Sequence, residues 1–250
     1  MKNKILAFLV VSFLAALPHS AKSQSVSPEP LYAQTDLKQL SKAYLSFGKL
    51  NSDSDAIIDQ YLMINECALF GQYYSNDIEW SKIRAATRAY IKTYAQSFPR
   101  RFEFTQPLYL DRYDFASGGF KLMANSMQTS VMRMIMSGNS TGGYPCLNNG
   151  PYSETDFPMN AVVTFTQPLN YTTVKTDQST AEEYLKYLEK NKPDTSLGRP
   201  AYIRYRVKVD QYMGPVKIGS EQYANFFGEL ESVSVFGDKD LFIKLEDRKF

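Results

Sequence analysis

The spacing of apolar residues divides the chain into a helical first part and a largely β second part. Between residues 35 and 98, apolar side chains recur every three or four positions, which is the period of an amphipathic α-helix. After Pro99 they alternate with polar side chains, which is the period of a half-buried β-strand. Because helices come first and strands follow, we expect an α+β fold: an N-terminal block of about three helices, then a mostly antiparallel β-sheet with one inserted helix.

The helical block, 35–98, is divided by polar and helix-breaking residues. The first helix is predicted over 35–50, and a second, which contains Cys67, follows the polar loop at 51–55. Asn76 with Glu79 three residues later resembles a capping box and predicts the start of a third helix. This helix is expected to stop before Pro99, since a proline disfavours the helical conformation of the residue that precedes it.

Period-two alternation marks the strands of the β region, 99–250. It occurs at 102–105, 131–136, 203–210 and, as a C-terminal hairpin, 233–235 with 241–245. Leu230 falls on the opposite phase to Val233, so a bulge is expected near Glu231 and Ser232. A capping box at Ser179–Glu182 predicts the inserted helix near 180–191. The β region and the helical block fit one domain or two closely packed subdomains.

Residues 1–23 have the pattern of a secretory signal peptide. A basic start precedes the apolar run 5–17, and small residues precede a cleavage site between Ser23 and Gln24. We therefore expect a periplasmic or secreted protein whose mature chain begins with a flexible segment, 24–34, and has no transmembrane segment.

Removal of residues 1–23 changes the charge and the available chemistry. The segment contains three lysines and no acidic residue, so the formal net charge moves from +2 to −1. It also contains His19, the only histidine, so the mature chain has none. A histidine-dependent triad or zinc site is therefore excluded, and a near-neutral chain argues against electrostatic binding of nucleic acid. Nothing in the sequence indicates a cofactor.

The two cysteines, Cys67 and Cys146, are expected to form a disulfide if the protein is exported. The bond would join a helix to a long loop rich in Gly, Asn, Ser and Pro, and loop closure would stabilise the protein by about 3–4 kcal/mol. The alternative is two unpaired thiols, with Cys67 buried on a helix face.

Basic residues repeat along the third helix and just after it. Arg84, Arg88 and Lys92 lie four residues apart, and Arg100 and Arg101 follow. Such a patch suits an anionic ligand or partner. The alternative is the solvated face of an ordinary helix.

Acidic residues are close together in the first β region. Glu103, Asp111 and Asp114 are candidates for a carboxylate pair that performs general acid/base catalysis, as in glycosidases. Turn and ion-pair chemistry explains the same residues.

Methionines alternate in one predicted strand. Met132, Met134 and Met136 are soft thioether ligands that would suit Cu(I) if they shared a face, whereas methionine also fills cores well.

A five-residue sequence, Phe-Thr-Gln-Pro-Leu, occurs at 104–108 and again at 165–169. It indicates either a duplicated β unit with two equivalent sites or the same strand-exit chemistry reached twice.

Several segments resemble an uncharacterised family of exported bacterial proteins, labelled domain of unknown function 4852. They are Asn76 to Phe120, with Phe98-Pro-Arg-Arg-Phe102 and Leu110-Asp-Arg-Tyr-Asp-Phe115 within it, and the strand Arg199–Val209. The resemblance implies a Gram-negative exported protein and carries no activity and no catalytic residues.

Three functions remain open on these observations. The first is a non-enzymatic binding or protein-interaction module of the cell envelope, with an envelope protein or glycan as its partner. The second is a histidine-independent envelope glycan hydrolase, and the third is a Cu(I)-binding protein that uses the methionine strand.

Overall fold

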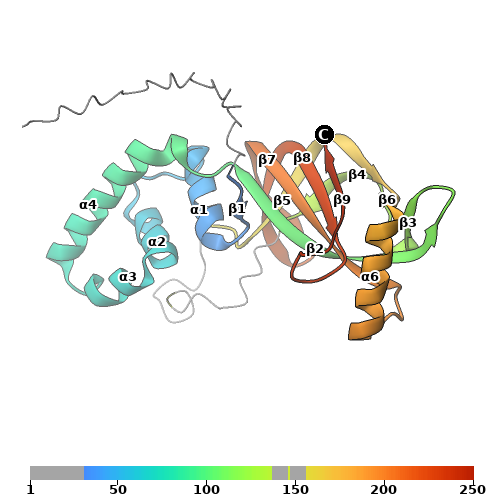
Figure 1. Cartoon of the computed structure of the whole chain (residues 1–250). Helices are drawn as coiled ribbons and strands as arrows, with labels where there is room; N and C mark the ends of the chain where they lie inside the picture. The colour runs from blue at the N-terminus through green and yellow to red at the C-terminus, as the bar shows by residue number, and fades with distance from the viewer. Residues whose placement is uncertain (1–30, 137–145, 147–155) are drawn as a thin grey trace, which may run out of the picture. The chain divides into compact units, whose positions relative to one another are not determined.

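The apolar residues change from helical to strand spacing at Pro99, and the structure changes there as well: four helices precede this residue and most of the described strands follow it (Figure 1). The computed structural model describes residues 31–136, 146 and 156–250. The predicted signal peptide, 1–23, and most of the predicted flexible segment, 24–34, lie outside the described residues. Leu31–Phe250 forms one compact unit, so the helical block and the β region belong together.

The described helices follow the predicted order. They are α1 (Leu37–Ser46), α2 (Asp55–Asn65), α3 (Cys67–Tyr73), α4 (Asp77–Tyr94) and, between strands, α6 (Gln178–Asn191), with short 3-10 turns η1 (Ala95–Ser97) and η2 (Ala124–Ser126). The predicted second helix is two helices, because Glu66 leaves the helical conformation at φ −130° and ψ 52°.

Two helix starts test the capping predictions. Asn76 caps α4 as predicted, since its side-chain oxygen accepts the backbone N–H of Glu79 at 3.2 Å. The predicted start of α6 at Ser179 is wrong by two residues. Asp177 is the N-cap and accepts the backbone N–H of Thr180, because a carboxylate there satisfies a free amide and favours the positive end of the helix dipole.

The strands form one curled, mixed sheet of nine strands. They are β1 (Ala33–Gln34), β2 (Arg101–Asp114), β3 (Gly119–Leu122), β4 (Gln128–Ile135), β5 (Asn160–Tyr171), β6 (Thr173–Lys175), β7 (Arg199–Ile218), β8 (Glu221–Phe236) and β9 (Lys244–Lys249). The main order is β4-β5-β8-β7-β2-β3-β6; β1 adds to β2 and β9 adds to β8. The β1–β2 and β5–β8 pairs are parallel and the other described pairs antiparallel. The sheet is therefore mixed: most of its pairs are antiparallel as expected, and the two parallel pairs were not predicted.

β1 also corrects the interpretation of the mature N-terminus. Ala33 pairs with Phe102 and Gln34 with Glu103, so these two residues belong to the sheet and not to a flexible segment. This pairing gives hydrogen-bond partners to backbone groups that the sequence pattern alone had left in a loop.

The register confirms the strongest strand prediction. The inward residues of β7, Ile203 to Val209 at every second position, are buried, and the alternating polar residues are half-buried or exposed. The predicted bulge is confirmed as well. Arg206 pairs with Ser232 and Val207 with Leu230, which leaves Glu231 as the extra residue. The C-terminal hairpin forms between β8 and β9, although β9 begins at Lys244, three residues after the predicted start at Leu241.

The sheet curls so that β4, at one end of the main strand order, lies near β2. The Gln106 side chain on β2 donates to the carbonyl oxygen of Ile135 on β4 at 3.2 Å, although β4 lies at the far end of the main strand order. On another side, Glu246 of β9 accepts the hydroxyl of Tyr171 at 2.6 Å and the backbone N–H of Lys175 at 2.7 Å. The curl encloses a core rich in aromatic side chains.

The helical block joins the sheet through α1. The buried ring of Tyr44 stacks on Phe226 of β8 at 5.7 Å, and its hydroxyl donates to the carbonyl oxygen of Pro158 at 2.8 Å. Close by, the Arg100 guanidinium lies over the Phe47 ring and donates to the carbonyl oxygen of Ser46. These contacts combine apolar burial with hydrogen bonds, so α1 and the sheet share one core.

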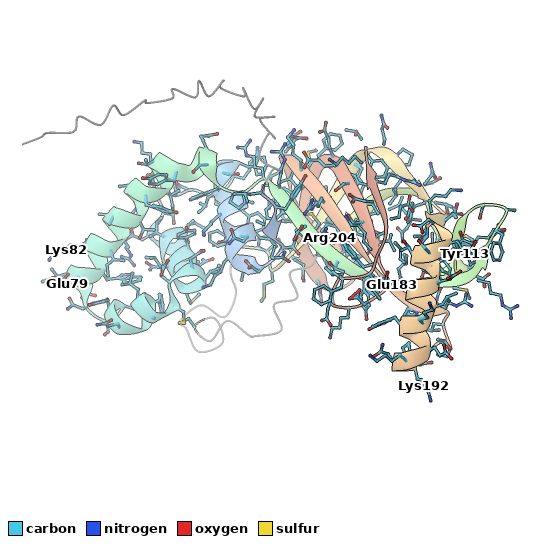
Figure 2. All side chains as sticks on the ribbon, in the orientation of Figure 1. Glu79, Lys82, Tyr113, Glu183, Lys192 and Arg204 are labelled. Carbon is cyan, nitrogen blue, oxygen red and sulfur yellow. A yellow bond between two sulfur atoms is a disulfide. The ribbon has the colours of Figure 1, made fainter. Side chains whose placement is uncertain are left out.

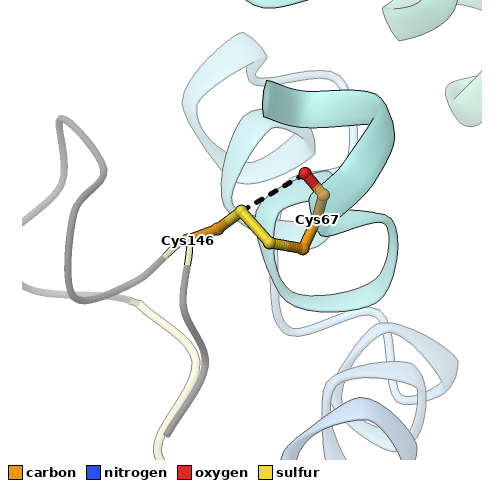
Figure 3. The surroundings of a disulfide bond; sticks show 2 residues. All are labelled: Cys67 and Cys146. Carbon is orange, nitrogen blue, oxygen red and sulfur yellow. Dashed lines mark hydrogen bonds between the residues drawn. A yellow bond between two sulfur atoms is a disulfide. The ribbon is translucent and has the colours of Figure 1, made fainter. Parts of the chain in front are cut away.

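The predicted disulfide is present. Cys67 at the start of α3 and Cys146 form a bond with 5.7 Å between their Cα atoms (Figure 3). Figure 3 also shows the Cys146 sulfur beside the carbonyl oxygen of Cys67, at 3.2 Å. The bond closes a loop of 79 residues that contains α4 and β2 to β4.

Replacing both cysteines by serine should lower the free energy of unfolding by about 3–4 kcal/mol, because the unfolded chain regains the entropy of the open loop. Urea denaturation of the wild type and the double Cys67→Ser/Cys146→Ser variant measures this difference. Equal midpoints would show that the bond contributes nothing to stability.

Two buried tyrosines provide a second test of the core. The Tyr205 hydroxyl is buried and has no hydrogen-bond partner among the described residues, whereas the Tyr184 hydroxyl donates to the carbonyl oxygen of Pro200 at 2.9 Å. We expect Tyr205→Phe to leave stability unchanged or to raise it, and Tyr184→Phe to lower it by about 1 kcal/mol. Chemical denaturation of both variants checks the difference; a larger loss for Tyr205→Phe would contradict it.

Candidate functional site

Arg84 and Arg88 lie on the side of α4 that faces α2. The carboxylate of Asp59, which is 1% exposed, accepts the Trp80 indole N–H at 2.9 Å and the Arg84 Nε–H at 2.6 Å. Asp55, one helical turn earlier on α2, pairs with both arginines. These two members of the predicted basic patch therefore contact carboxylates within the protein, which leaves less of their charge for an outside anion.

The other three basic residues lie elsewhere. Lys92 is exposed near the end of α4. Arg100 contacts α1, as described above, and Arg101 forms an ion pair with Glu231 at 3.0 Å. The five residues do not form one continuous basic surface. The outer end of α4 has balanced charge too, since Glu79 pairs with Lys82 (Figure 2).

The three candidate carboxylates are distributed along β2. Glu103 pairs with Arg206 at 3.1 Å, while Asp111 lies eight residues further on, about 27 Å along an extended strand. Catalytic carboxylates of glycosidases lie within about 10 Å of each other. Asp114 is the last residue of β2, beside the turn to β3, and hydrogen bonds from Ser117 and from the Ala116 amide lower its pKa. The structure therefore does not bring Glu103 and the two aspartates together.

The three methionines are separated by an irregularity in β4. Met134 and Met136 are buried, whereas Met132 is exposed, because the β4–β5 register shifts between Val131 and Arg133. A shift of one residue turns a side chain to the other face of a sheet. The thioethers of all three therefore do not converge on one face. Among the described residues there is also no group of three or more His, Cys, Asp or Glu side chains placed to hold a metal ion.

The two Phe-Thr-Gln-Pro-Leu sequences occupy similar local environments. In each copy the Phe and the Leu are buried in the core, at 104 and 108 of β2 and at 165 and 169 of β5. Pro107 pairs with β7 on one side, and on its other side it lies between the part of β2 that pairs with β1 and the part that pairs with β3. Pro168 lies beyond the last residue of β5 that pairs with β8. Proline has no N–H to leave unpaired at such an edge, which favours recurring strand chemistry over a duplicated site.

A cleft of about 810 Å³ lies where the helical block meets the sheet. Its lining residues come from the α1–α2 connection, the start of α2, the segment before β5, and the β7–β8 hairpin: Lys49, Leu50, Asn51, Ser54, Ile57, Asp156, Pro158, Tyr212, Met213, Gly214, Pro215 and Gln222. We call this cavity the junction cleft. Its lining mixes charged, amide, hydroxyl, aromatic and aliphatic side chains.

The sheet side of the junction cleft is an unpaired strand edge. β2 pairs with β7 only as far as Lys208, and no strand covers the later residues of β7 on that side in the part of the chain that the structure describes. Asp210 and Met213 are bulged residues and Pro215 has no N–H. Bulges and proline are common features that prevent a free edge from pairing with other chains. Side chains rather than a continuous backbone ladder therefore dominate this surface.

The helix side of the junction cleft is held by polar contacts. The Gln60 side chain accepts the backbone N–H of Asp156 at 2.7 Å and donates to its carboxylate at 3.0 Å. The Tyr44 hydroxyl holds Pro158. Ser54, the N-cap of α2, makes no side-chain capping bond, so its hydroxyl is available at the cleft.

Sequence analysis did not find the junction cleft. The one available signal was the loss of alternation after Val209, where Gln-Tyr-Met-Gly-Pro interrupts a strong strand pattern. Gly and Pro within a strand indicate a bulge or a free edge. The residues from the helices and from the segment before β5 that complete the cleft lie more than 50 residues earlier in the chain, so no local pattern could have joined them.

Fold and cleft define an α+β protein whose helical block and curled sheet share one core and leave a cleft between them. The chain belongs to the family described as a domain of unknown function (DUF4852), whose family model matches residues 53–187. Comparison with curated proteins and with solved structures gave no match. In the described residues, no helix is both long and apolar enough to cross a membrane.

The ion pairs between α2 and α4 lead to a stability prediction. Arg84→Met should lower the free energy of unfolding by about 3–5 kcal/mol, because the buried Asp59 carboxylate loses two charge-assisted hydrogen bonds. The double variant Asp59→Leu/Arg84→Met should recover much of this loss, since it removes the buried charge as well. Urea denaturation gives both values; a double variant no more stable than Arg84→Met would contradict the explanation.

Proposed function

We propose that this protein is an exported, non-catalytic binding module of the cell envelope that holds a segment of a partner polypeptide in its junction cleft. The observation that carries the proposal is the junction cleft itself. It lies where two parts of the fold meet, and it combines aliphatic and aromatic surface with amide, hydroxyl and charged groups. Ligand sites commonly have this composition and size.

A polypeptide segment suits this lining. Leu50, Ile57 and Pro215 offer apolar surface for side chains, and the amides of Asn51 and Gln222 can pair with a peptide backbone. The Met213 side chain is 57% exposed beside them, and an unbranched thioether adapts to different apolar partners. The bulged edge of β7 prevents indiscriminate strand addition, which is useful in a protein that must bind one partner and not aggregate.

Two further observations support the remaining parts of the proposal. The N-terminal apolar segment and the Cys67–Cys146 disulfide both suit an oxidising compartment outside the cytoplasm. The separation of the acidic candidates along β2 favours binding over glycan hydrolysis, because it leaves Glu103 far from Asp111.

Site-specific photocrosslinking tests the proposal. A benzophenone amino acid replaces Met213 or Gln222 in the cleft, and Phe115, which is 78% exposed on the β2–β3 turn, in the control. In cells that produce the protein, we expect both cleft positions to give the same adduct and Phe115 to give none. Mass spectrometry should map the adducts to one short contiguous stretch of one partner.

The affinity of that mapped stretch completes the test. A synthetic peptide of the stretch should bind the purified wild-type protein, and Met213→Arg should weaken binding at least tenfold, since a long charged side chain then occupies the apolar part of the cleft. Phe115→Ser should leave the affinity unchanged. The proposal would be ruled out if the cleft and control positions gave the same adducts, or if the peptide bound the Met213→Arg variant as tightly as the wild type.

A further inference from the structure

A second cavity lies wholly within the helical block. It is a groove of about 370 Å³ bordered by all four helices of that block, and its lining residues are Lys42, Tyr61, Leu62, Glu66, Leu69, Ile83, Ala86, Thr87 and Tyr90. We call it the helical groove. It shares no residue with the junction cleft, so the argument that follows is independent of the proposed function.

The helical groove is apolar in its floor and walls. Leu62 and the ring of Tyr61 are buried beneath it, while Leu69 and Ile83 are half-buried at its sides. The groove exists because α4 touches α2 through a narrow contact: Trp80 and Ile91 are its only buried residues, and Arg84 and Arg88 fill the space between them. An ionic contact of this kind leaves the neighbouring apolar stripe of α4 without a helix to cover it.

The lining of the helical groove includes one cationic residue. Lys42 of α1 is half-buried in the lining and forms no ion pair with a carboxylate among the described residues. A half-buried lysine packs its aliphatic stem on apolar surface and presents its ammonium group beside that surface, where it attracts an anion. Glu66, the other charged residue in the lining, is exposed to solvent, so its repulsion of an anion is weakened by water.

The lining of the helical groove also includes a phenol hydroxyl, that of Tyr61. Burial raises the pKa of Tyr61, with smaller contributions from Tyr90 and Glu66, so the Tyr61 hydroxyl remains protonated at all physiological pH values. A protonated hydroxyl can donate a hydrogen bond to an acid oxygen. The combination of an apolar slot, an unpaired ammonium group and a phenol matches the two ends of an amphiphile.

We propose that the helical groove binds a single-chain amphiphile with an anionic head, with the acyl chain along Leu62, Leu69, Ile83 and Ala86 and the head at Lys42. Free fatty acids and lysophospholipids share this chemistry. The site size of about 370 Å³ accommodates one chain, since small-molecule sites begin at about 300 Å³. Affinity should rise by up to about fourfold for each added methylene until the groove is filled.

Adjacent alanines on α4 provide a matched pair of variants. Ala86 lines the helical groove, whereas Ala85 is exposed one residue earlier and does not. Ala86→Trp should therefore block the groove and Ala85→Trp should not, although the two substitutions add the same bulk to the same helix. Circular dichroism and thermal melting confirm that both variants fold.

Calorimetric titration with laurate, below its critical micelle concentration, tests the apolar part of the site. We expect one molecule bound per chain, a loss of at least tenfold in affinity for Ala86→Trp, and no change for Ala85→Trp. The proposal fails if laurate does not bind, or if the two tryptophan variants behave alike.

The same titration with charge variants tests the head. Lys42→Met should weaken laurate binding at least fivefold and leave dodecyl maltoside unaffected, with Lys38→Met, an exposed lysine one turn earlier on α1, as control. Glu66→Gln should tighten laurate binding about twofold, because it removes a repulsive charge. Dodecyltrimethylammonium binding as tight as laurate, or an equal effect of Lys38→Met, would overturn the assignment of the head to Lys42.

A last comparison separates the two sources of this chemistry. Laurate and lauroyl lysophosphatidylglycerol have the same chain and different anionic heads. Tighter binding of laurate, sensitive to Lys42→Met, assigns the groove to free fatty acids, and tighter binding of the lysophospholipid assigns it to lipid-derived chains. If neither head responds to Lys42→Met, the proposal is wrong.

Discussion

Burial of the inner face of the β7–β8 hairpin is the constraint on which the rest of the structure depends. β7 is twenty residues long and alternates strictly over its first half, so one complete face must leave water. β2 covers one side of the hairpin, β5 and β9 cover the other, and α1 covers its far end through Tyr44 and Phe226. Beyond Lys208, where β7 is no longer paired with β2 and the alternation stops, the same hairpin becomes a wall of the junction cleft. The core and the candidate site are thus two parts of one strand pair.

A single buried carboxylate organises the helical block. Asp59 is costly to bury alone, and Trp80 and Arg84 compensate for that cost by supplying hydrogen bonds. The contact between α2 and α4 turns the arginines of α4 inward. Because this contact is ionic, it leaves open a space between the helices that apolar side chains would have filled. The basic stripe and the apolar helical groove therefore have the same origin. They differ in whether an outside ligand can reach them, because the arginines contact other residues of the protein whereas the groove is open to solvent.

In three places, a proline lies at a free strand edge and prevents that edge from pairing with another chain. Pro107, Pro168 and Pro215 each lie where a strand has a partner on one side only, and bulges at Asp210 and Met213 add to the effect. A curled sheet that does not close completely must leave such edges, and proline removes the N–H that would otherwise pair with another chain. The repeated Phe-Thr-Gln-Pro-Leu sequence follows from this requirement.

The sequence by itself determined the class of fold, the period of most elements, the β7 alternation, the bulge at Glu231 and the pairing of Cys67 with Cys146. These features depend on local patterns or on a count of two cysteines, and a strict alternation permits only one buried face. The tertiary structure alone decided the parallel β5–β8 pairing, the inward turn of Arg84 and Arg88, the separation of Met132 from Met134, and the junction cleft. Each of these depends on a distant segment: Val163 of β5 pairs with Phe226, Arg84 pairs with Asp59, and the β5 register sets the direction of Met132. The junction cleft joins Ile57 with Tyr212. A periodic pattern shows which side chains share a face, whereas only the assembled neighbours show what that face contacts.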